Sequence, residues 1–74
     1  MDPTNLGKKI RDTRKQLKLN QADLALVANT ATRFISDLEN GKPTCHLGKT
    51  LDVLKALGIK VTLASPEEGD HPHD

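Results

Sequence analysis

The chain has 74 residues, of which 11 are Lys or Arg and 10 are Asp or Glu, and its net charge is +1. It contains one Phe and no Trp or Tyr, so its single small core must be built from aliphatic side chains. No apolar run approaches the roughly 20 residues that span a bilayer, no signal peptide is evident, and one Cys cannot form an internal disulfide. These features argue against a membrane-spanning or disulfide-stabilised protein and favour a cytoplasmic one.

The basic residues are concentrated in the body of the chain. All 11 Lys and Arg lie between Lys8 and Lys60, and residues 1–64 contain six acidic groups, which leaves a net charge of +5 there. The last eight residues contain the other four acidic groups: Glu67, Glu68, Asp70 and Asp74. A basic body with an acidic tail is compatible with a polyanionic partner.

The spacing of apolar residues predicts a first helix that Thr4 or Asn5 caps. Its apolar face carries Leu6, Ile10 and Leu17. The opposite face collects basic side chains: Lys8, Lys9, Arg11, Lys15 and Lys18.

A second helix is predicted to begin at the cap Asn20, with Asp23 placed three residues later to favour the exposed N–H groups. It ends at Asn29, a residue type that tolerates the left-handed conformation. Its expected core positions are Leu24, Ala25, Val27 and Ala28.

A third helix is predicted from about Ala31 to Glu39 or Asn40, and Gly41 with Pro43 closes it. A fourth helix begins after Thr44 and ends at Gly58. Its side chains that are expected to point inward are Leu47, Leu51, Leu54 and Leu57.

The interruption between the second and third helices rotates the third one. At 100° per residue, Ala31, Phe34, Ile35 and Leu38 share one face of it. The opposite face is polar, with Thr32 on its flank, and consists of Arg33, Ser36, Asp37 and Asn40. An exposed helix about 10 Å wide fits the major groove of DNA. The alternative is an ordinary helical bundle whose polar face is only solvated.

Residues 59–64 alternate as a β-strand does, with Ile59, Val61 and Leu63 on one side. One strand alone lacks hydrogen-bond partners, so we expect it to pair with the same strand of a second copy. Twofold symmetry would then place two recognition helices about 34 Å apart and require a palindromic operator. The alternative is a loose apolar arm. Residues 65–74 have little to bury and are expected to be disordered.

The segment LNQADLALVANTATRFISDLENGK closely resembles the helix-turn-helix of the Cro/cI (Xre) repressor family, and the match extends from Leu6 to about Leu57. The residues at that family's signature positions are Gln21, Leu24, Ala25, Asn29, Ile35, Leu38, Glu39, Asn40 and Gly41. RFISDLENGKPT, followed by a helix and LGIKVTLAS, looks most like the HipB-type antitoxins, which are dimeric repressors that pair with a HipA-type serine/threonine kinase toxin.

The resemblance implies an all-α, lambda-repressor-like bundle of four to five helices in residues 1–58. A dimerising β-strand at 59–64 and a disordered acidic tail at 65–74 would follow it. It also implies that Gln21, Asn40 and Lys42 contact DNA phosphates, and the capping residue Asn20 is a further candidate. Lys42 could equally be a solvated lysine.

Base reading is expected to fall to the exposed polar residues of the third helix: Thr32, Arg33, Ser36 and Asp37. Asp37 could accept a hydrogen bond from a cytosine amino group or pair with Arg33, and we expect the pair. Arg14 and Glu39 match positions that form an internal ion pair in several relatives, and we expect a structural role for them.

The sequence departs from the family pattern twice. Ala31 stands where the family usually has a capping Ser or Thr, so Thr30 or Asn29 is expected to cap the helix one residue early. Lys18 replaces a glycine that is common before the second helix, which could change the shape of the first turn.

No enzyme, metal or cofactor is expected. His71 and His73 lie near the end of the chain and Cys45, which we expect to be a small buried residue, is far from them, so they make a poor metal site. No nucleophile and base are evidently paired. Two alternatives to an antitoxin remain: a phage-type or restriction-control regulator without a toxin, and a protein-interaction adaptor that no longer reads DNA.

Overall fold

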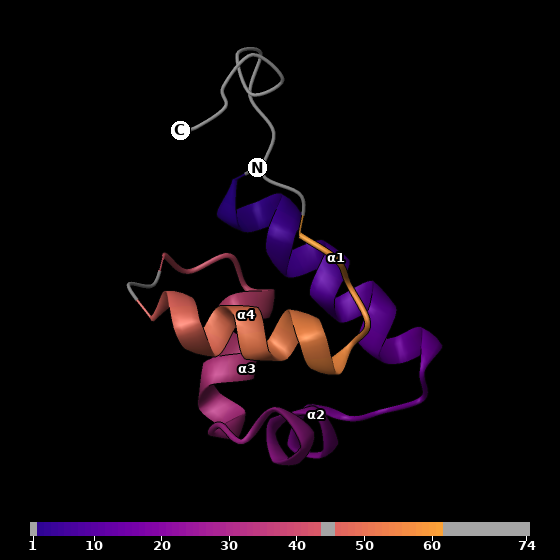
Figure 1. Cartoon of the computed structure of the whole chain (residues 1–74). Coiled ribbons are helices and arrows are strands. Elements are labelled where there is room, and N and C mark those ends of the chain that lie inside the picture. The colour runs from indigo at the N-terminus through magenta and orange to yellow at the C-terminus, as the bar shows by residue number, and fades with distance from the viewer. Residues whose placement is uncertain (1, 44–45, 62–74) are drawn as a thin grey trace, which may run out of the picture.

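The computed structural model describes residues 2–43 and 46–61, and these residues form four helices (Figure 1). The helices are α1 (Pro3–Gln16), α2 (Gln21–Ala28), α3 (Thr32–Glu39) and α4 (Leu47–Ala56). α3 packs on α1 and α2, and α4 packs on α2. The expected all-α helix-turn-helix bundle is confirmed. No helix of the described part is both long and apolar enough to cross a membrane.

The core is aliphatic, as the composition predicts. Its buried apolar members come from all four helices and the turn after α4: Ile10, Leu24, Ala25, Ala28, Ile35, Leu38, Val53, Leu54 and Leu57. Each fully buried Leu or Ile side chain contributes about 1.5–3 kcal/mol of stability relative to an exposed one.

Four side chains that were expected inside are exposed. Leu17 follows the last residue of α1 and is 50% exposed. Val27 is 62% exposed because α3 and α4 cover the other side of α2. In α4 the buried stripe includes Thr50 and Val53, so the stripe of Leu47 (68% exposed) and Leu51 (42%) faces outward.

Each described helix ends in the same way, with one residue in the left-handed conformation. In all four cases the N–H of the next residue bonds to a carbonyl five positions earlier, at 2.9–3.1 Å, as in a Schellman motif. The left-handed residues are Lys18, Asn29, Gly41 and Gly58. Asn29 confirms the expected end of α2. Lys18 itself adopts the conformation that glycine favours, with φ 60°, so the lysine does not prevent this turn.

Two of the expected helix starts are wrong. Asp2 caps α1 by accepting from the N–H of Asn5 at 2.8 Å, because Pro3 already begins the helix. Ala31 occupies the cap position of α3 without a side-chain bond, and the helix begins at Thr32. The expected cap of α2, Asn20, is confirmed, and with Asp23 it forms a reciprocal capping box: the Asp23 N–H bonds to the Asn20 side chain at 2.7 Å, and the Asn20 N–H bonds to Asp23 at 3.0 Å.

α1 and α3 touch backbone to backbone. A Cβ at Gly7 would overlap the carbonyl oxygen of Leu38 and lie 2.8 Å from that of Glu39. Glycine in a helix interior costs roughly 0.5–1 kcal/mol relative to alanine. At this position glycine is nevertheless required, because no other residue lets α1 approach the end of α3 so closely.

Several sequence predictions concern the segment after α4. Ile59 packs against the core, and residues 59–61 form no strand in the single chain. Leu63, the acidic tail, Thr44 and Cys45 lie outside the described residues. Pairing of this segment across a dimer stays a prediction.

We expect Gly7→Ala to lower the free energy of unfolding by about 2 kcal/mol, because the new methyl group must push α1 away from α3. Gly48→Ala is the matched control. Gly48 lies in α4, and the place that an added methyl group would occupy has nothing within 4 Å, so alanine should raise stability by about 0.5–1 kcal/mol. Urea unfolding at one fixed protein concentration measures both, and equal stability of the two variants would contradict the close approach.

Candidate nucleic-acid interface

α2 and α3 are two short helices joined by the three-residue turn Asn29, Thr30 and Ala31. The left-handed Asn29 ends α2, and α3 leaves the turn in a new direction. Ile35 and Leu38 bury one side of α3. Its other side is open to solvent, as the sequence predicts.

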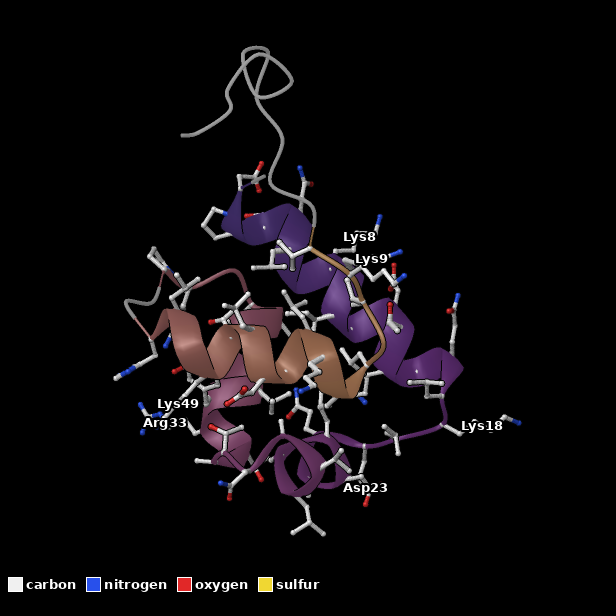
Figure 2. The ribbon with its side chains drawn as sticks, in the orientation of Figure 1. Lys8, Lys9, Lys18, Asp23, Arg33 and Lys49 are labelled. Carbon is white, nitrogen blue, oxygen red and sulfur yellow. The ribbon has the colours of Figure 1, made fainter. Side chains whose placement is uncertain are left out.

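The four expected base-reading residues lie together on this open side. Thr32 and Arg33 are exposed, and Ser36 and Asp37 are half-buried. Within the described part of the chain Arg33 makes no ion pair, and its side chain projects away from the bundle (Figure 2). Its guanidinium is therefore available to a ligand.

The expected ion pair between Arg33 and Asp37 is wrong. Asp37 pairs instead with Lys42, at 3.4 Å between Nζ and Oδ1. The turn at Gly41 explains this, because the Lys42 N–H bonds to the Asp37 carbonyl at 3.0 Å and brings the two side chains together. Since the Lys42 side chain is 62% exposed and that of Asp37 is 37% exposed, solvent screens the pair and it contributes little stability.

The expected phosphate-contacting residues lie at both ends of the motif. Asn20 is exposed, and the oxygen of its side chain is engaged in the capping box. Gln21 is half-buried at the first position of α2. Asn40 and Lys42 are exposed just after α3, and the Asn40 amide is 3.5 Å from the Ser36 hydroxyl.

Arg14 and Glu39 form the expected internal ion pair. Arg14 Nε donates to Glu39 Oε2 at 2.6 Å, and Nη2 donates to Oε1 at 3.0 Å. The third nitrogen, Nη1, donates to the carbonyl of Leu19 in the turn before α2, at 2.8 Å. Gln21 Nε2 donates to Glu39 Oε1 at 3.1 Å, a contact that the sequence does not indicate. This polar cluster of Arg14, Glu39, Gln21 and Leu19 connects α1, α2 and α3.

The polar cluster keeps Glu39 ionised. Burial alone would raise the pKa of the Glu39 carboxyl, but hydrogen bonds from Arg14 and Gln21 and the charges of Arg14 and Arg11 outweigh it, so that pKa is lowered. The hydrogen bond to Glu39 raises the pKa of Arg14. Glu39 is thus an anion that is fully satisfied inside the fold.

The sequence does not indicate two further residues that lie near the open side of α3 and contact Phe34. The Lys49 ammonium of α4 lies 6.0 Å from the centroid of the Phe34 ring, and Lys49 and Arg33 occupy the same side of the molecule (Figure 2). The His46 ring meets Phe34 edge-to-face at 6.2 Å. Position along the chain could not reveal this, because Lys49 belongs to a different helix. Lys8 and Lys9 of α1 lie on another side, away from Arg33.

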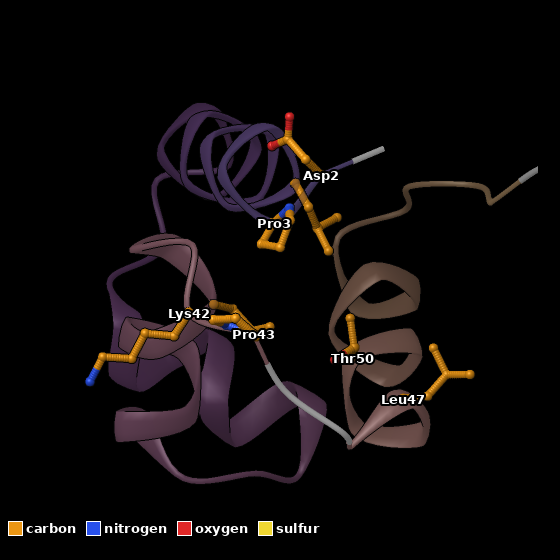
Figure 3. A pocket seen from close by; sticks show the side chains of 8 residues that line it. Asp2, Pro3, Lys42, Pro43, Leu47 and Thr50 are labelled. Atoms are coloured by element: carbon orange, nitrogen blue, oxygen red, sulfur yellow. The ribbon is translucent and has the colours of Figure 1, made fainter.

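An apolar groove of about 260 Å³ lies apart from the open side of α3, between the start of α1, the segment after α3 and α4 (Figure 3). Its walls include Pro3, Pro43 and Leu47, and the Lys42 ammonium points away from it. Among residues 2–43 and 46–61 no cluster of three His, Cys, Asp or Glu could hold a metal ion. His71, His73 and Cys45 lie outside these ranges.

A helix-turn-helix family model matches residues 10–63. Over 66 residues, which are 89% of this chain and 87% of the relative, the chain is 46% identical to the HTH-type transcriptional regulator y4mF of Sinorhizobium fredii (strain NBRC 101917 / NGR234). The chain belongs to the Cro/cI-type (Xre) helix-turn-helix family of transcriptional regulators.

Three further proteins are similar to this chain in sequence or in structure. The immunity repressor protein of Bacillus phage phi105 is 35% identical over 63 residues, which are 85% of this chain and 44% of the repressor. The restriction-modification controller protein C.AhdI from Aeromonas hydrophila has a similar structure (TM-score 0.71, 25% identity, 80% of this chain and 86% of that one). A chain in a HipA–HipB–O2–O3 complex also has a similar structure (TM-score 0.78, 26% identity, 89% of this chain and 93% of that one).

We expect the stability contributed by ionised Glu39 to be fully present above about pH 4.3, the pKa of a free Glu, and to be lost as the pH falls through the lower pKa of the folded state. Urea titrations at a series of pH values from neutral to below about 4.3 measure the unfolding free energy. As the pH falls, this free energy should decrease more steeply for the wild type than for a variant that carries Arg14→Met and Glu39→Leu together. Replacing both partners leaves no unpaired buried charge, so the variant should fold. Parallel pH curves would contradict the lowered pKa.

Proposed function

We propose that this regulator is a dimeric repressor that reads a palindromic operator with α3. We further propose that it acts as the antitoxin of a HipBA-like module, repressing its own operon and binding a HipA-like serine/threonine kinase toxin. The observation that carries the proposal is the open polar side of α3, opposite the buried Ile35 and Leu38. A helix with one such side can enter a major groove without disturbing the core.

Arg33 is the principal base-reading residue of the proposal. Because no carboxylate of the described chain holds it, its two outer nitrogens can both donate to O6 and N7 of one guanine, worth about 1–3 kcal/mol of discrimination. Thr32 can offer its methyl group to thymine, and Ser36 can donate or accept. Asp37 is a weaker candidate, since its carboxylate is neutralised by Lys42 rather than directed at a base.

The phosphate contacts of the proposal lie around α3. Asn20 and Gln21 stand at the start of α2, where N–H groups and the helix dipole favour an anion. Asn40 and Lys42 stand just after α3. Such contacts fix the position of the protein and supply affinity that depends on salt, without reading sequence.

Dimerisation is proposed through the segment with Ile59, Val61 and Leu63. Val61 is 43% exposed in the single chain, and Leu51 of α4 is 42% exposed, so a second copy would remove apolar surface from water. A twofold axis there would present two α3 helices to successive major grooves, about 34 Å apart.

The kinase partner rests on the likeness to the chain in the HipA–HipB–O2–O3 complex. The likeness to the restriction-modification controller protein and to the phage repressor supports a second candidate, a dimeric regulator without a toxin. A protein-interaction adaptor would be a third, and it would show no operator preference.

The first experiment selects preferred duplexes from a random DNA library and measures affinity for the selected and for random duplexes. We expect Arg33→Ala to weaken the selected duplex about 5- to 150-fold and to change random duplexes little. Lys42→Ala should weaken both kinds alike and reduce the slope of log K against log salt by about one. Lys9→Ala, on α1 away from Arg33, is the control. It should change the preference for the selected duplex less than Arg33→Ala does, and the salt slope less than Lys42→Ala does. Selection that enriches no sequence would favour the adaptor.

The second experiment tests the partner. We expect the product of the neighbouring reading frame to copurify with this protein when the two are expressed together, and to have protein kinase activity when it is released. A neighbour without kinase activity, or none that binds, would leave the regulator without a toxin as the better proposal.

A further inference from the structure

Phe34 is the only Phe, Tyr or Trp of the 74-residue chain, and it does not lie in the centre of the core. It is half-buried on α3, at the border between the buried side and the open polar side, and packs against the edge of the core. Its outer part meets Lys49 and His46 of the α4 region. The ring therefore supports charged and polar side chains of another helix beside α3.

The Lys49 ammonium lies over this ring. It is 6.0 Å from the ring centroid, within the range of a cation–π interaction, and the residue is exposed. No acidic residue of the described chain pairs with it. The ring limits where the flexible lysine can move, while the ammonium keeps its three donors for a ligand.

The two edges of the open side of α3 carry different groups. Glu39 lies at one edge and contacts Gln21 at the start of α2. Phe34 lies at the other edge and contacts Lys49. A helix in a major groove has one phosphate backbone on each side of it. The contacts of Gln21 and Lys49 thus correspond to the two borders of such a groove.

We propose that Lys49 is a phosphate-binding residue that Phe34 positions on the edge of α3 opposite Gln21. The inference rests on the proposed DNA binding and adds to it a contact from α4. In the bound state the lysine donates to a backbone phosphate while its side chain stays over the ring, so binding requires little further ordering of that side chain.

Titrations of the selected duplex and of a random duplex between about 0.05 and 0.3 M salt, a range over which screening of exposed charges increases strongly, test the proposal. We expect Lys49→Ala to weaken both duplexes about eightfold at about 0.1 M salt and to reduce the salt slope by about 0.9, the effect of one phosphate. Lys49→Arg, which keeps the charge, should restore the slope. Lys9→Ala removes the same charge from α1, and its smaller effect measures the contribution of net charge alone.

Phe34→Leu tests the positioning role. We expect the salt slope to stay close to that of the wild type, because the lysine remains, while affinity falls about two- to fivefold, because its side chain must be ordered on binding. The same loss should vanish when Phe34→Leu is combined with Lys49→Ala. Thermal unfolding of each variant shows whether it is folded at the titration temperature, and a loss that persists in the double variant would assign Phe34 a packing role only.

The outcomes separate this inference from the proposed function. If the wild type binds no duplex, the proposed function fails. If it binds and Lys49→Ala behaves like Lys9→Ala, DNA binding stands and the role of Lys49 is overturned. If Lys49→Ala lowers the salt slope but Lys49→Arg does not restore it, Lys49 affects DNA binding only through the structure of the protein. The phosphate contact is then also overturned.

Discussion

One buried carboxylate holds the arrangement of α1, α2 and α3. Glu39 accepts two hydrogen bonds from Arg14 and one from Gln21, and Arg14 uses its remaining nitrogen on the Leu19 carbonyl. Every partner in this cluster is satisfied, which is the condition under which a buried charge is tolerated. Removing one partner of such a pair typically costs about 3–5 kcal/mol, because the other charge is left buried and unpaired. The orientation of the two short helices that form the proposed interface therefore depends on α1.

The close contact at Gly7 makes this dependence possible. Because α1 reaches the backbone of Leu38 and Glu39, the Arg14 side chain, about two turns further along α1, meets Glu39 at bonding distance. With α1 on one side and α2 on another, α3 has only one side left for solvent. The polar side of α3 is thus exposed by the packing of its neighbours and not by its own amphipathic pattern alone.

The carboxylates of α3 are each paired with a basic side chain. Glu39 is neutralised by Arg14 within the fold, and Asp37 is neutralised by Lys42 at the surface. Arg33 and Lys49 are left without acidic partners in the described part of the chain. A phosphate approaching this side meets available cations, which is the electrostatic condition for binding a polyanion.

The sequence by itself determined the local features of this protein: the capping box of Asn20 and Asp23, the left-handed end at Asn29, the glycine ends of α3 and α4, and the polar stripe of α3. Each depends on hydrogen bonds or steric limits within about six residues, so the residue types alone specify it. Only the tertiary structure decided that Val53 is buried while Leu51 is exposed, and that Asp37 pairs with Lys42. Only there does Lys49 reach Phe34. Burial and contacts between helices depend on the angle and depth at which the helices cross, and between α1 and α3 a glycine and one ion pair that joins distant segments limit both.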